Sequence, residues 1–321
     1  MTAAGVVAGI IDTALDRSIV GGYTWIGHAV RRRLPTWPDD PRPDALSGRH
    51  VIVTGASSGL GLATAAALVY LGAHVHCVVR DTDKQSLVGQ RIGSQSSWTA
   101  WQCDLADLDS VRRFSADFLA AGHQLAGIVH NAGIMPAERT LTAAGHELSM
   151  AVHVLAPVLM TDLLLPALAP DARVLFITSG GMYAQKLRLD DLTYVETPYR
   201  PSVAYARSKR AQVELLGPLQ SRWPGLRVYA THPGWAQSPG LDGSLPGFSR
   251  LLRPWLRRGS AAIDTTTWLL ATDDAPPGGG LWHDRRQRPT SYLPFTRTTA
   301  AQRQRLMAWV DEQIGDLTPG P

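Results

Sequence analysis

The residues best suited to acid–base chemistry are a tyrosine and a lysine four positions apart, Tyr205 and Lys209. They form the only YxxxK pattern in the chain and use one of just three lysines. At i and i+4 on a helix the two side chains share one face, so the ammonium can stabilise a phenolate and lower the pKa of the tyrosine. Such a tyrosine can donate a proton to a carbonyl or take one from an alcohol. Taken alone, the pattern is more often an ordinary pair on a helix surface.

A serine upstream adds a hydroxyl to this pair. Ser179 directly follows the apolar run VLFIT at residues 174–178, which is typical of a buried strand. A hydroxyl at the tip of such a strand is placed to hydrogen-bond the oxygen of a substrate. The sequence therefore offers a proton donor, a cation that tunes it and a group that orients the substrate.

The elements that must position these residues alternate between short apolar runs and longer helical patterns. Strands that alternate with helices of about ten or more residues indicate a parallel sheet covered on both faces. We therefore expect an α/β, three-layer, Rossmann-like doubly wound parallel sheet, with ligands beyond the carboxyl ends of the strands. The expected strands are residues 50–54, 75–79, 98–103, 126–130, 174–178 and 226–231, and the expected helices are residues 60–71, 108–120, 148–168, 204–220, 261–271 and 302–314.

A glycine-rich turn, TGASSGLG at residues 54–61, joins the first expected strand to the first expected helix. The glycines permit a tight turn and a close backbone approach, while free N–H groups and the positive end of the helix dipole bind a pyrophosphate. This context predicts a dinucleotide cofactor. The expected contacts are Gly55, Ser57, Ser58, Gly59, Leu60 and Gly61.

The tip of the second expected strand distinguishes between two forms of the cofactor. That strand ends in Val79, Arg80 and Asp81, and the residue at this tip faces the adenosine ribose in Rossmann folds. An arginine pairs with a 2′-phosphate, whereas an acidic residue binds the free 2′-hydroxyl. Because Arg80 comes first, the sequence favours NADP(H), and NAD(H) served by Asp81 stays open.

Taken together and in this order, these motifs resemble the short-chain dehydrogenase/reductase superfamily over roughly residues 48–285. The resemblance implies a nicotinamide cofactor, catalysis by Ser179, Tyr205 and Lys209, and cofactor contacts from the same tyrosine and lysine. The further cofactor contacts that the resemblance implies are Asp104, Leu105, Asn131, Ala132, Gly133, Pro233 and Gly234. Of these, Asn131 could instead simply brace its turn.

Further segments narrow the resemblance within the superfamily. The runs SGGM at 179–182, QKL at 185–187, HPGW at 232–235 and LPGF at 245–248 are similar to proteins like dehydrogenase/reductase SDR family member twelve. This group is similar to the retinol-dehydrogenase-like enzymes but poorly defined in substrate. The closer resemblance therefore adds little about the chemistry.

One position departs from the superfamily pattern. The superfamily usually has an asparagine whose backbone carbonyl holds a water in the proton relay to the lysine, and His153 occupies the aligned position here. The backbone carbonyl can serve regardless of the side chain, or the imidazole can join the relay as a fourth catalytic residue. Reduced activity and a merely structural helix histidine are the other readings, and the sequence does not separate them.

Around the catalytic domain, expected at 49–321, we expect an N-terminal helical extension at 1–34 and a proline-rich linker at 35–48. A substrate lid is expected at 235–260. Its apolar and aromatic side chains favour a hydrophobic carbonyl or alcohol substrate, although they could instead cover the core or a subunit interface. These side chains are Trp235, Leu241, Leu245, Phe248, Leu251, Leu252 and Trp255.

Composition limits the partners and the compartment. The net charge is +4 and the arginines are scattered, which argues against nucleic-acid binding. Cys77 and Cys103 lie in apolar runs and suit a reducing, cytoplasmic setting without a metal site. No apolar run reaches the roughly twenty residues needed to cross a bilayer. A peripheral membrane contact through residues 3–34 and a homo-oligomer both stay open.

These observations predict an NADP(H)-dependent oxidoreductase that interconverts a hydrophobic ketone or aldehyde and its alcohol by hydride transfer, with Tyr205 as general acid and base. The alternative is a weakly active or non-catalytic protein that binds NADP(H) as a sensor or partner subunit. An epimerase or dehydratase on the same fold is disfavoured because its usual glycine spacing, TGxxGxxG, is absent.

Overall fold

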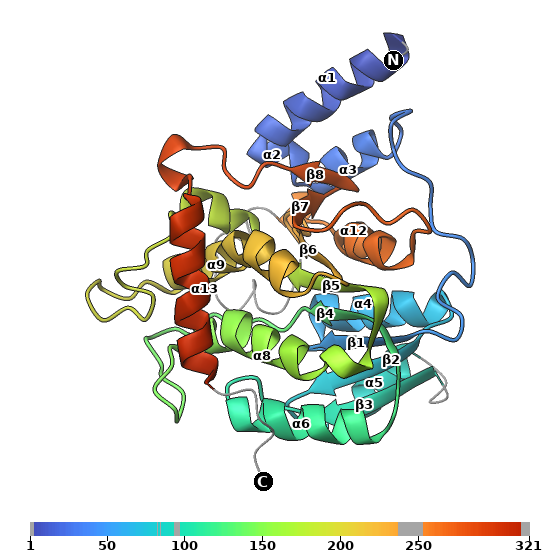
Figure 1. The fold of residues 1–321 in the computed structure, drawn as a ribbon. Helices are drawn as coiled ribbons and strands as arrows, with labels where there is room; N and C mark the ends of the chain where they lie inside the picture. Colours follow the sequence, from blue (N-terminus) through green and yellow to red (C-terminus); the bar gives the residue numbers. More distant parts are fainter. Residues whose placement is uncertain (1–2, 82, 84, 93–96, 237–252, 316–321) are drawn as a thin grey trace.

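The chain is organised around one sheet of eight strands in the order β3-β2-β1-β4-β5-β6-β7-β8 (Figure 1). The computed structural model describes residues 3–81, 83, 85–92, 97–236 and 253–315. All neighbouring strands are parallel except β7 and β8, which form an antiparallel hairpin at one edge. The strands are β1 (His50–Thr54), β2 (His74–Val79), β3 (Trp98–Gln102), β4 (Leu125–His130), β5 (Leu168–Ile177), β6 (Arg227–Thr231), β7 (Gly280–His283) and β8 (Arg286–Arg288).

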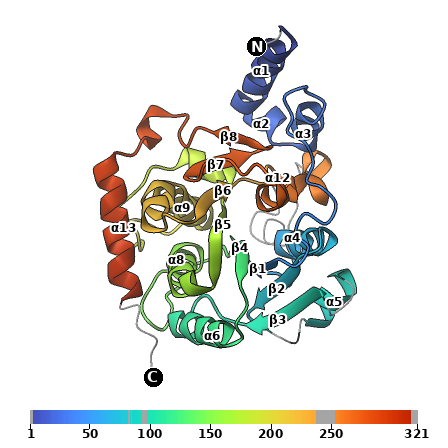
Figure 2. The same cartoon turned by 45° about the vertical axis from the view of Figure 1, so that its right-hand side comes forward.

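Helices cover both faces of this sheet, as Figure 2 shows. One face carries α4 (Gly59–Tyr70), α5 (Gln85–Ile92) and α12 (Ser260–Ala271). The other carries α6 (Leu108–Ala120), α8 (Ala156–Leu163) and α9 (Pro201–Arg222), with α13 (Ala300–Ile314) packed on α9. The expected three-layer, doubly wound Rossmann-like fold is confirmed, and the strand order reverses between β1 and β4, where such folds bind ligands.

Each face of the sheet has its own apolar core. Cys77 lies in the core under α4 and α12, and Cys103 lies in the core under α6, α8 and α9. Both thiols are free and buried. The two cysteines therefore act as small core side chains, as their apolar surroundings in the sequence predicted.

The prediction of one continuous helix at 148–168 is wrong. The segment is divided into α7 (Leu148–Met150), a π-helical turn η3 (Ala151–Leu155), α8 and the short 3₁₀ turn η4 (Leu165–Ala167). Pro157 has no N–H to donate to the carbonyl four residues earlier, so the regular pattern of helix hydrogen bonds is interrupted at this point. The wider turn carries His153 toward the interior.

The edge hairpin β7–β8 was missing from the expected strands. Its two-residue turn consists of Asp284 and Arg285, both with positive φ of 50° and 52°. Turns of this kind usually contain asparagine or glycine, so the sequence carried no turn signal. The carboxylate of Asp284 is instead held by buried arginines from distant segments, which stabilise the turn.

The N-terminal residues form three helices, α1 (Ala3–Arg17), α2 (Ile19–Gly22) and α3 (Trp25–Arg31), beside the β7–β8 hairpin (Figure 1). Asp12 on α1 accepts hydrogen bonds from Arg31 on α3 and from Arg288 on β8, both at 2.8 Å. Among the described residues, every helix is too short or too polar to pass through a bilayer.

Residues 35–48 connect this extension to β1 while contacting the domain on the way. Arg285 stacks over the ring of Trp37 at 4.9 Å and donates to the backbone carbonyls of Pro38 and Asp39. Leu46 is buried, and its N–H donates to the carbonyl of Leu71. The extension and the connecting residues therefore pack against the sheet domain.

Candidate active site

Tyr205 and Lys209 lie one turn apart on α9, beside the carboxyl end of β5. The ammonium nitrogen of Lys209 donates a 2.8 Å hydrogen bond to the backbone carbonyl of Ile177, the last residue of β5. The backbone carbonyl of Lys209 in turn accepts from the Thr178 hydroxyl at 3.0 Å. These two bonds tie α9 to the strand end, where the Ser179 side chain lies beside the Tyr205 hydroxyl. The fold therefore brings the three predicted catalytic residues together.

The apolar surroundings shift the pKa values of this pair toward the neutral forms. Burial raises the pKa of Tyr205 to about 12, against the opposing effect of the Ser179 hydrogen bond. Burial lowers the pKa of Lys209 to about 7. The sequence predicted that the lysine lowers the tyrosine pKa, but its nitrogen is directed at the Ile177 carbonyl and lies 5.6 Å from the ring centroid, so burial outweighs it. Tyr205 is therefore a neutral phenol, the form that can protonate a carbonyl oxygen.

Ser179 begins the short turn η5 (Gly180–Ala184) that follows β5. Its backbone is still extended, and its hydroxyl accepts a long 3.4 Å hydrogen bond from the N–H of Gly181. The side chain is partly exposed at the carboxyl edge of the sheet. It can therefore hold an oxygen that is presented to Tyr205.

His153 lies completely buried behind Tyr205, with the two rings packed edge to face at 5.3 Å. Its Nε2 accepts a 2.9 Å hydrogen bond from the backbone N–H of Ile134. A backbone N–H can only donate, so the imidazole proton is on Nδ1, and it is donated to the Ser208 hydroxyl at 2.7 Å. Ser208 then donates to the backbone carbonyl of Tyr205 at 2.8 Å.

This directed chain occupies both nitrogens of the imidazole. Burial and the nearby charge of Lys209 hold the pKa of His153 well below its usual value, so the ring is neutral. The ring connects the loop after β4, at Ile134, to the turn of α9 that carries Tyr205. The geometry fits a hydrogen-bonded structural histidine better than a side chain that exchanges protons.

The backbone carbonyl of His153 has a partner that sequence reasoning missed. The side-chain amide of Gln212, three residues after Lys209 on α9, donates to it at 2.7 Å. In a regular α-helix the His153 carbonyl would accept from the N–H four residues later, but that residue is Pro157, which has no N–H. Pro157, four residues after His153, leaves the His153 carbonyl without its usual donor, and a glutamine on the facing helix can replace that donor. This combination is the signal that could have identified Gln212.

The glycine turn is folded tightly against its surroundings. Gly55 has a φ of +66°, and a Cβ there would lie 2.9 Å from the Cα of Ala132. A Cβ on Gly61 would lie 2.3 Å from the carbonyl oxygen of Gly55. Neither position can therefore hold a larger residue without a shift of the backbone. The turn is compact because its glycines permit these approaches.

The start of α4 is suited to hold a phosphate group. Ser58, the residue that precedes the helix, makes no side-chain hydrogen bond to the first helical N–H groups. Ser58 and Gly59 are exposed, and Ser57 and Leu60 are partly exposed. Uncapped N–H groups at the positive end of a helix dipole attract an anion. The residues present therefore fit the pyrophosphate of a dinucleotide.

Asn131 braces the floor of this site. Its side-chain amide donates to the backbone carbonyl of Thr54 at 3.0 Å. The backbone N–H groups of Asn131 and Ala132 both donate to the Thr54 hydroxyl, at 3.0 and 3.1 Å. The ends of β1 and β4 are thereby joined, as the bracing interpretation of Asn131 predicted. Gly133 follows on the exposed side, and cofactor contacts from the three residues stay a prediction.

Arg80 and Asp81 at the tip of β2 differ in their surroundings. Asp81 accepts a 2.9 Å hydrogen bond from the N–H of Asp83 within its own turn. Arg80 is exposed, and its guanidinium has no hydrogen bond or ion pair with another described residue. After the neighbouring strand β3, Asp104 similarly accepts from the N–H of Ala106 at 3.0 Å, and Leu105 is buried.

The predicted contacts Pro233 and Gly234 follow β6 and are partly exposed. Gly234 has a φ of +76°, and a Cβ there would lie 2.5 Å from Arg257 and 2.6 Å from the carbonyl of Tyr23. The base of the expected lid is therefore packed against the N-terminal extension, through residues that sequence reasoning did not select. Most of that lid, residues 237–252, lies outside the described residues, including Leu241, Leu245, Phe248, Leu251 and Leu252.

A histidine cluster at the opposite edge of the sheet is distinct from this site. His50, His74 and His76 place ring nitrogens within 4.8 Å of one another. Trp101 donates to Nδ1 of His76 at 3.0 Å, so the proton of neutral His76 is on Nε2 and points at Nδ1 of His50, also 3.0 Å away. This arrangement is a hydrogen-bonded chain, in which Nε2 of His76 has no lone pair for a metal ion.

Comparison with known proteins identifies the relatives of the chain. A family model described as short chain dehydrogenase matches residues 49–189. Dehydrogenase/reductase SDR family member 12 of Bos taurus is 34% identical over 284 residues, 86% of this chain and 89% of that protein. Retinol dehydrogenase 12 of Homo sapiens is 36% identical over 246 residues, 74% of this chain and 78% of that protein.

A solved structure gives the same result for the fold. The Pseudomonas aeruginosa RhlG/NADP active-site complex matches with a TM-score of 0.62 and 22% identity over 75% of this chain and 96% of that one. The two sequence relatives extend the likeness over most of the chain. The chain therefore belongs to the short-chain dehydrogenase/reductase family of oxidoreductases.

Proposed function

We propose that this protein is an NADP(H)-dependent oxidoreductase that interconverts a hydrophobic ketone or aldehyde and its alcohol. The observation that supports this most strongly is the neutral Tyr205 phenol held between Ser179 and α9, with Lys209 anchored to Ile177 behind it. A hydroxyl that orients an oxygen and a phenol that can protonate it are the two groups that carbonyl reduction needs from the protein.

The cofactor, when bound, supplies the hydride. In the direction of reduction, Ser179 orients the substrate oxygen and Tyr205 donates its proton to that oxygen. In the reverse direction the Tyr205 phenolate accepts the proton from the alcohol. Lys209, whose pKa near 7 leaves part of it charged at neutral pH, stabilises the phenolate. His153 holds Tyr205 in place through Ser208.

The preference for NADP(H) rests on the tip of β2. Arg80 presents an exposed guanidinium, whereas Asp81 is engaged with the N–H of Asp83. A free arginine fork at this position complements a 2′-phosphate, and an engaged carboxylate is less available to a 2′-hydroxyl. NAD(H) would gain nothing from Arg80.

The substrate class and the setting are extensions of this proposal. The apolar composition of residues 235–260 supports a hydrophobic carbonyl or alcohol. The buried free thiols of Cys77 and Cys103, whose pKa values burial raises to about 12, suit a reducing, cytoplasmic compartment. We also propose a homo-oligomer, with an interface outside α8, because residues 156–162 of that helix are buried within the chain itself.

The direct test is NADPH consumption with a panel of hydrophobic ketones and aldehydes, using wild type and Tyr205→Phe. We expect turnover by wild type, and a loss of about a hundredfold or more in Tyr205→Phe, because the general acid is removed. The phenylalanine variant should retain NADPH binding in calorimetry, since the glycine turn and Arg80 are unchanged.

Two outcomes would contradict the proposal. NADPH binding without turnover of any carbonyl or alcohol would favour a cofactor-binding sensor or partner. Turnover that is equal in wild type and in Tyr205→Phe would show that Tyr205 is not the acid.

A further inference from the structure

The first helix is oriented in the reverse of the usual way. Asp12 and Asp16 face the protein and are 4% and 6% exposed. The outward side chains are apolar: Val6, Val7 and Ile10 are 45%, 55% and 65% exposed. An amphipathic helix of a globular protein normally buries its apolar stripe and exposes its charges. The reversal means that the apolar face of α1 is covered by no described part of this chain.

The buried carboxylates hold α1 in this orientation. The carboxylate of Asp12 forms ion pairs with Arg31, Arg286 and Arg288. These arginines hold the pKa of the carboxyl below its usual range. Asp16 accepts from the hydroxyl of Tyr292. A rotation of α1 that buried its apolar face would break these bonds and expose the arginines of the hairpin. The outward apolar face is therefore a stable property of the fold.

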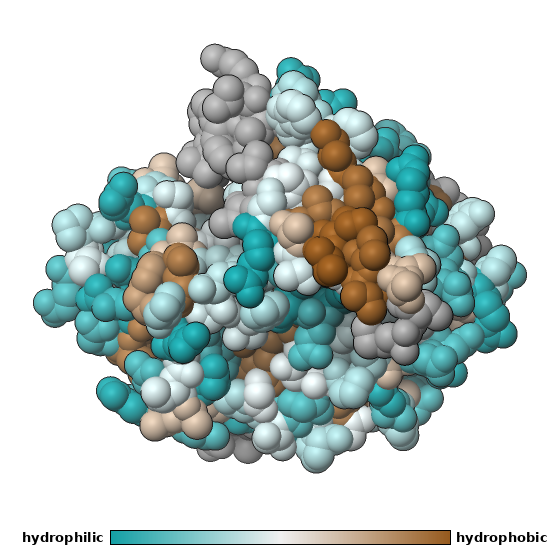
Figure 3. All heavy atoms as spheres, turned by 90° about the horizontal axis from the view of Figure 1, so that it is seen from above, coloured by the Kyte–Doolittle hydropathy of each residue, from teal (hydrophilic) through white to brown (hydrophobic). Residues whose placement is uncertain are grey.

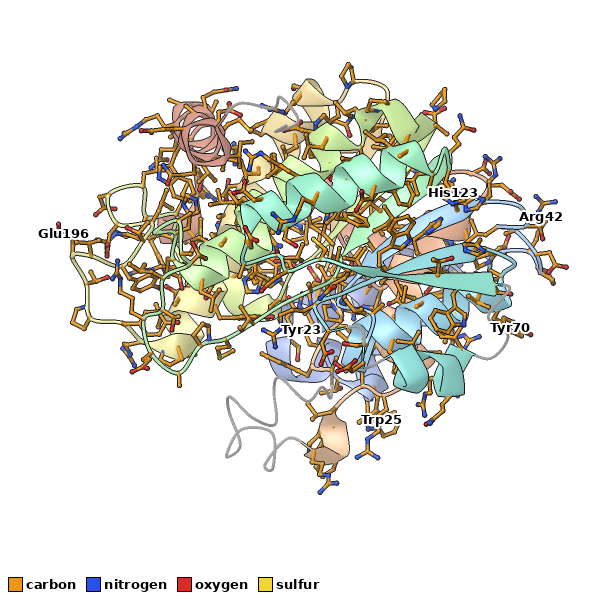
Figure 4. All side chains as sticks on the ribbon, turned by 90° about the horizontal axis from the view of Figure 1, so that it is seen from below. Tyr23, Trp25, Arg42, Tyr70, His123 and Glu196 are labelled. Carbon is orange, nitrogen blue, oxygen red and sulfur yellow. The ribbon has the colours of Figure 1, made fainter. Side chains whose placement is uncertain are left out.

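Two exposed tryptophans lie where α3 contacts the segment before α12. Trp25, at the start of α3, is 47% exposed, and its indole N–H donates to the carbonyl of Pro254 at 2.9 Å. Trp255 beside it is also 47% exposed. Figure 3, seen from the end at which α1 projects, shows one large apolar area besides several smaller ones, and Figure 4 shows Trp25 at the outer edge of the molecule.

The exposed charges of residues 3–34 are all positive. Asp12 and Asp16 are the only acidic residues in 3–34, and both are buried. Among Arg17, Arg32, Arg33, Arg253 and Arg258, only Arg32 pairs with a carboxylate of a described residue, that of Asp40, in an exposed contact of 3.4 Å. The exposed cations on α1, after α3 and around Trp255 are Arg17, Arg32, Arg33, Arg253 and Arg258.

We propose that α1 lies in the surface of an anionic lipid bilayer, with Val6, Val7, Ile10 and Ile11 inserted at the boundary of the headgroups and acyl chains. Apolar side chains on one face of a helix, tryptophans at its border and arginines around it are the features of helices that bind such surfaces. Tryptophan favours this boundary because its ring is apolar and its N–H is polar. The excess of positive charge favours anionic lipid over a second copy of this chain, whose matching surface would carry the same excess.

The test is co-sedimentation of the full chain with vesicles of phosphatidylcholine, with and without phosphatidylserine. We expect wild type to bind the vesicles that contain phosphatidylserine, and to bind them more weakly as salt rises. Val7→Ser combined with Ile10→Ser should lower the binding constant at least about tenfold, because apolar area no longer leaves water. Both positions are exposed, so the circular dichroism spectrum and thermal midpoint should not change.

Matched control variants distinguish binding through this face from nonspecific hydrophobic binding. Val195→Ser and Tyr70→Ser remove side chains that are 69% and 85% exposed on other surfaces, and both variants should bind vesicles like wild type. Arg32→Gln combined with Arg33→Gln should reduce the dependence on phosphatidylserine.

Three results would overturn the proposal. Wild type could stay in the supernatant with every vesicle, or the Val7→Ser, Ile10→Ser protein could bind as tightly as Val195→Ser. The third is a dimer of wild type, seen by analytical ultracentrifugation without lipid, that dissociates in the Val7→Ser, Ile10→Ser protein. That result would assign the face to a second copy of the chain.

Discussion

The guanidinium of Arg31 lies 2.6 Å from the carboxylate of Asp284, and both side chains are almost completely buried. Arg31 comes from α3 and Asp284 from the turn of the β7–β8 hairpin. Asp284 also pairs with Arg257 at the base of the expected lid, at 2.5 Å, and its pKa is held well below the usual range by neighbouring positive charge. One carboxylate thus joins the N-terminal extension, the edge hairpin and the base of the expected lid.

We therefore predict that Arg31→Met lowers the free energy of unfolding by about 3 kcal/mol, because it leaves part of the Asp284 charge buried without a partner. Urea denaturation measures this loss. Arg32→Met is the matched control, because its pair with Asp40 is 58% exposed on both sides, and it should cost less than about 1 kcal/mol. Equal effects of the two variants would contradict the structural role of the buried pair.

Replacing His153 by asparagine should leave kcat within a few-fold of wild type and its pH profile unchanged. Both nitrogens of the imidazole are occupied by Ile134 and Ser208, and the backbone carbonyl keeps its bond from Gln212. The variant should instead lose about 1–3 kcal/mol of stability through weakened buried hydrogen bonds. A fall in kcat of about a hundredfold with an altered pH profile and an intact fold would make His153 a catalytic residue.

Arg80→Ala should weaken NADPH binding roughly 10- to 100-fold and leave NADH binding almost unchanged, because a charge-assisted hydrogen bond to the 2′-phosphate is lost. Calorimetric titration with both cofactors measures the difference. Asp81→Asn is a useful companion, since its carboxylate is engaged in its own turn, and NADPH should bind it like wild type. The same loss for NADH as for NADPH in Arg80→Ala would count against the assignment.

Gly59→Val should abolish cofactor binding. Gly59 has a φ of +55° in the first turn of α4 and is exposed, so a branched side chain would strain the backbone and occupy the space of the pyrophosphate. Gly145→Val is the control for strain alone, because Gly145 has a φ of +85° with nothing within 4 Å of an added Cβ. Calorimetry should show normal NADPH affinity for the control and none for Gly59→Val.

Stability should fall as the pH drops below about 6.5. Burial lowers the pKa of His76 and of His130 to about 3, while the same side chains in the unfolded chain bind a proton near 6.5. The unfolded state therefore holds more protons between these values, and the folded state loses up to about 1.4 kcal/mol per histidine for each pH unit. Urea midpoints measured across this range test the slope.

A variant separates His76 from the other titrating groups. His76→Gln retains an acceptor for Trp101 but cannot titrate, so its urea midpoints should depend less steeply on pH than those of wild type. An unchanged slope would show that His76 does not contribute to the acid sensitivity.

Local patterns in the sequence were sufficient for the central fold and for selecting Ser179, Tyr205 and Lys209, which the fold brings together; their catalytic roles stay a prediction. Apolar runs of strand length, such as residues 50–54, matched the observed β1, and α6 begins and ends where its pattern predicted. The glycine turn and the Tyr205–Lys209 spacing are equally local, because each depends on the conformation of only a few neighbouring residues. Such features are visible in one sequence because short-range sterics and helix periodicity determine them.

Tertiary structure alone decided the remaining features, because they depend on residues far apart in the chain. Asp12 and Asp16 look like the polar stripe of a surface helix, and only the buried arginines of α3 and β8 turn them inward. The β7–β8 turn adopts positive φ at Asp284 because Arg31 and Arg257 hold its carboxylate. The occupied nitrogens of His153 likewise depend on Ile134 and Ser208, which no local pattern connects to it. Long-range hydrogen bonds and buried charge set these conformations against the local preference, which is why sequence periodicity does not show them.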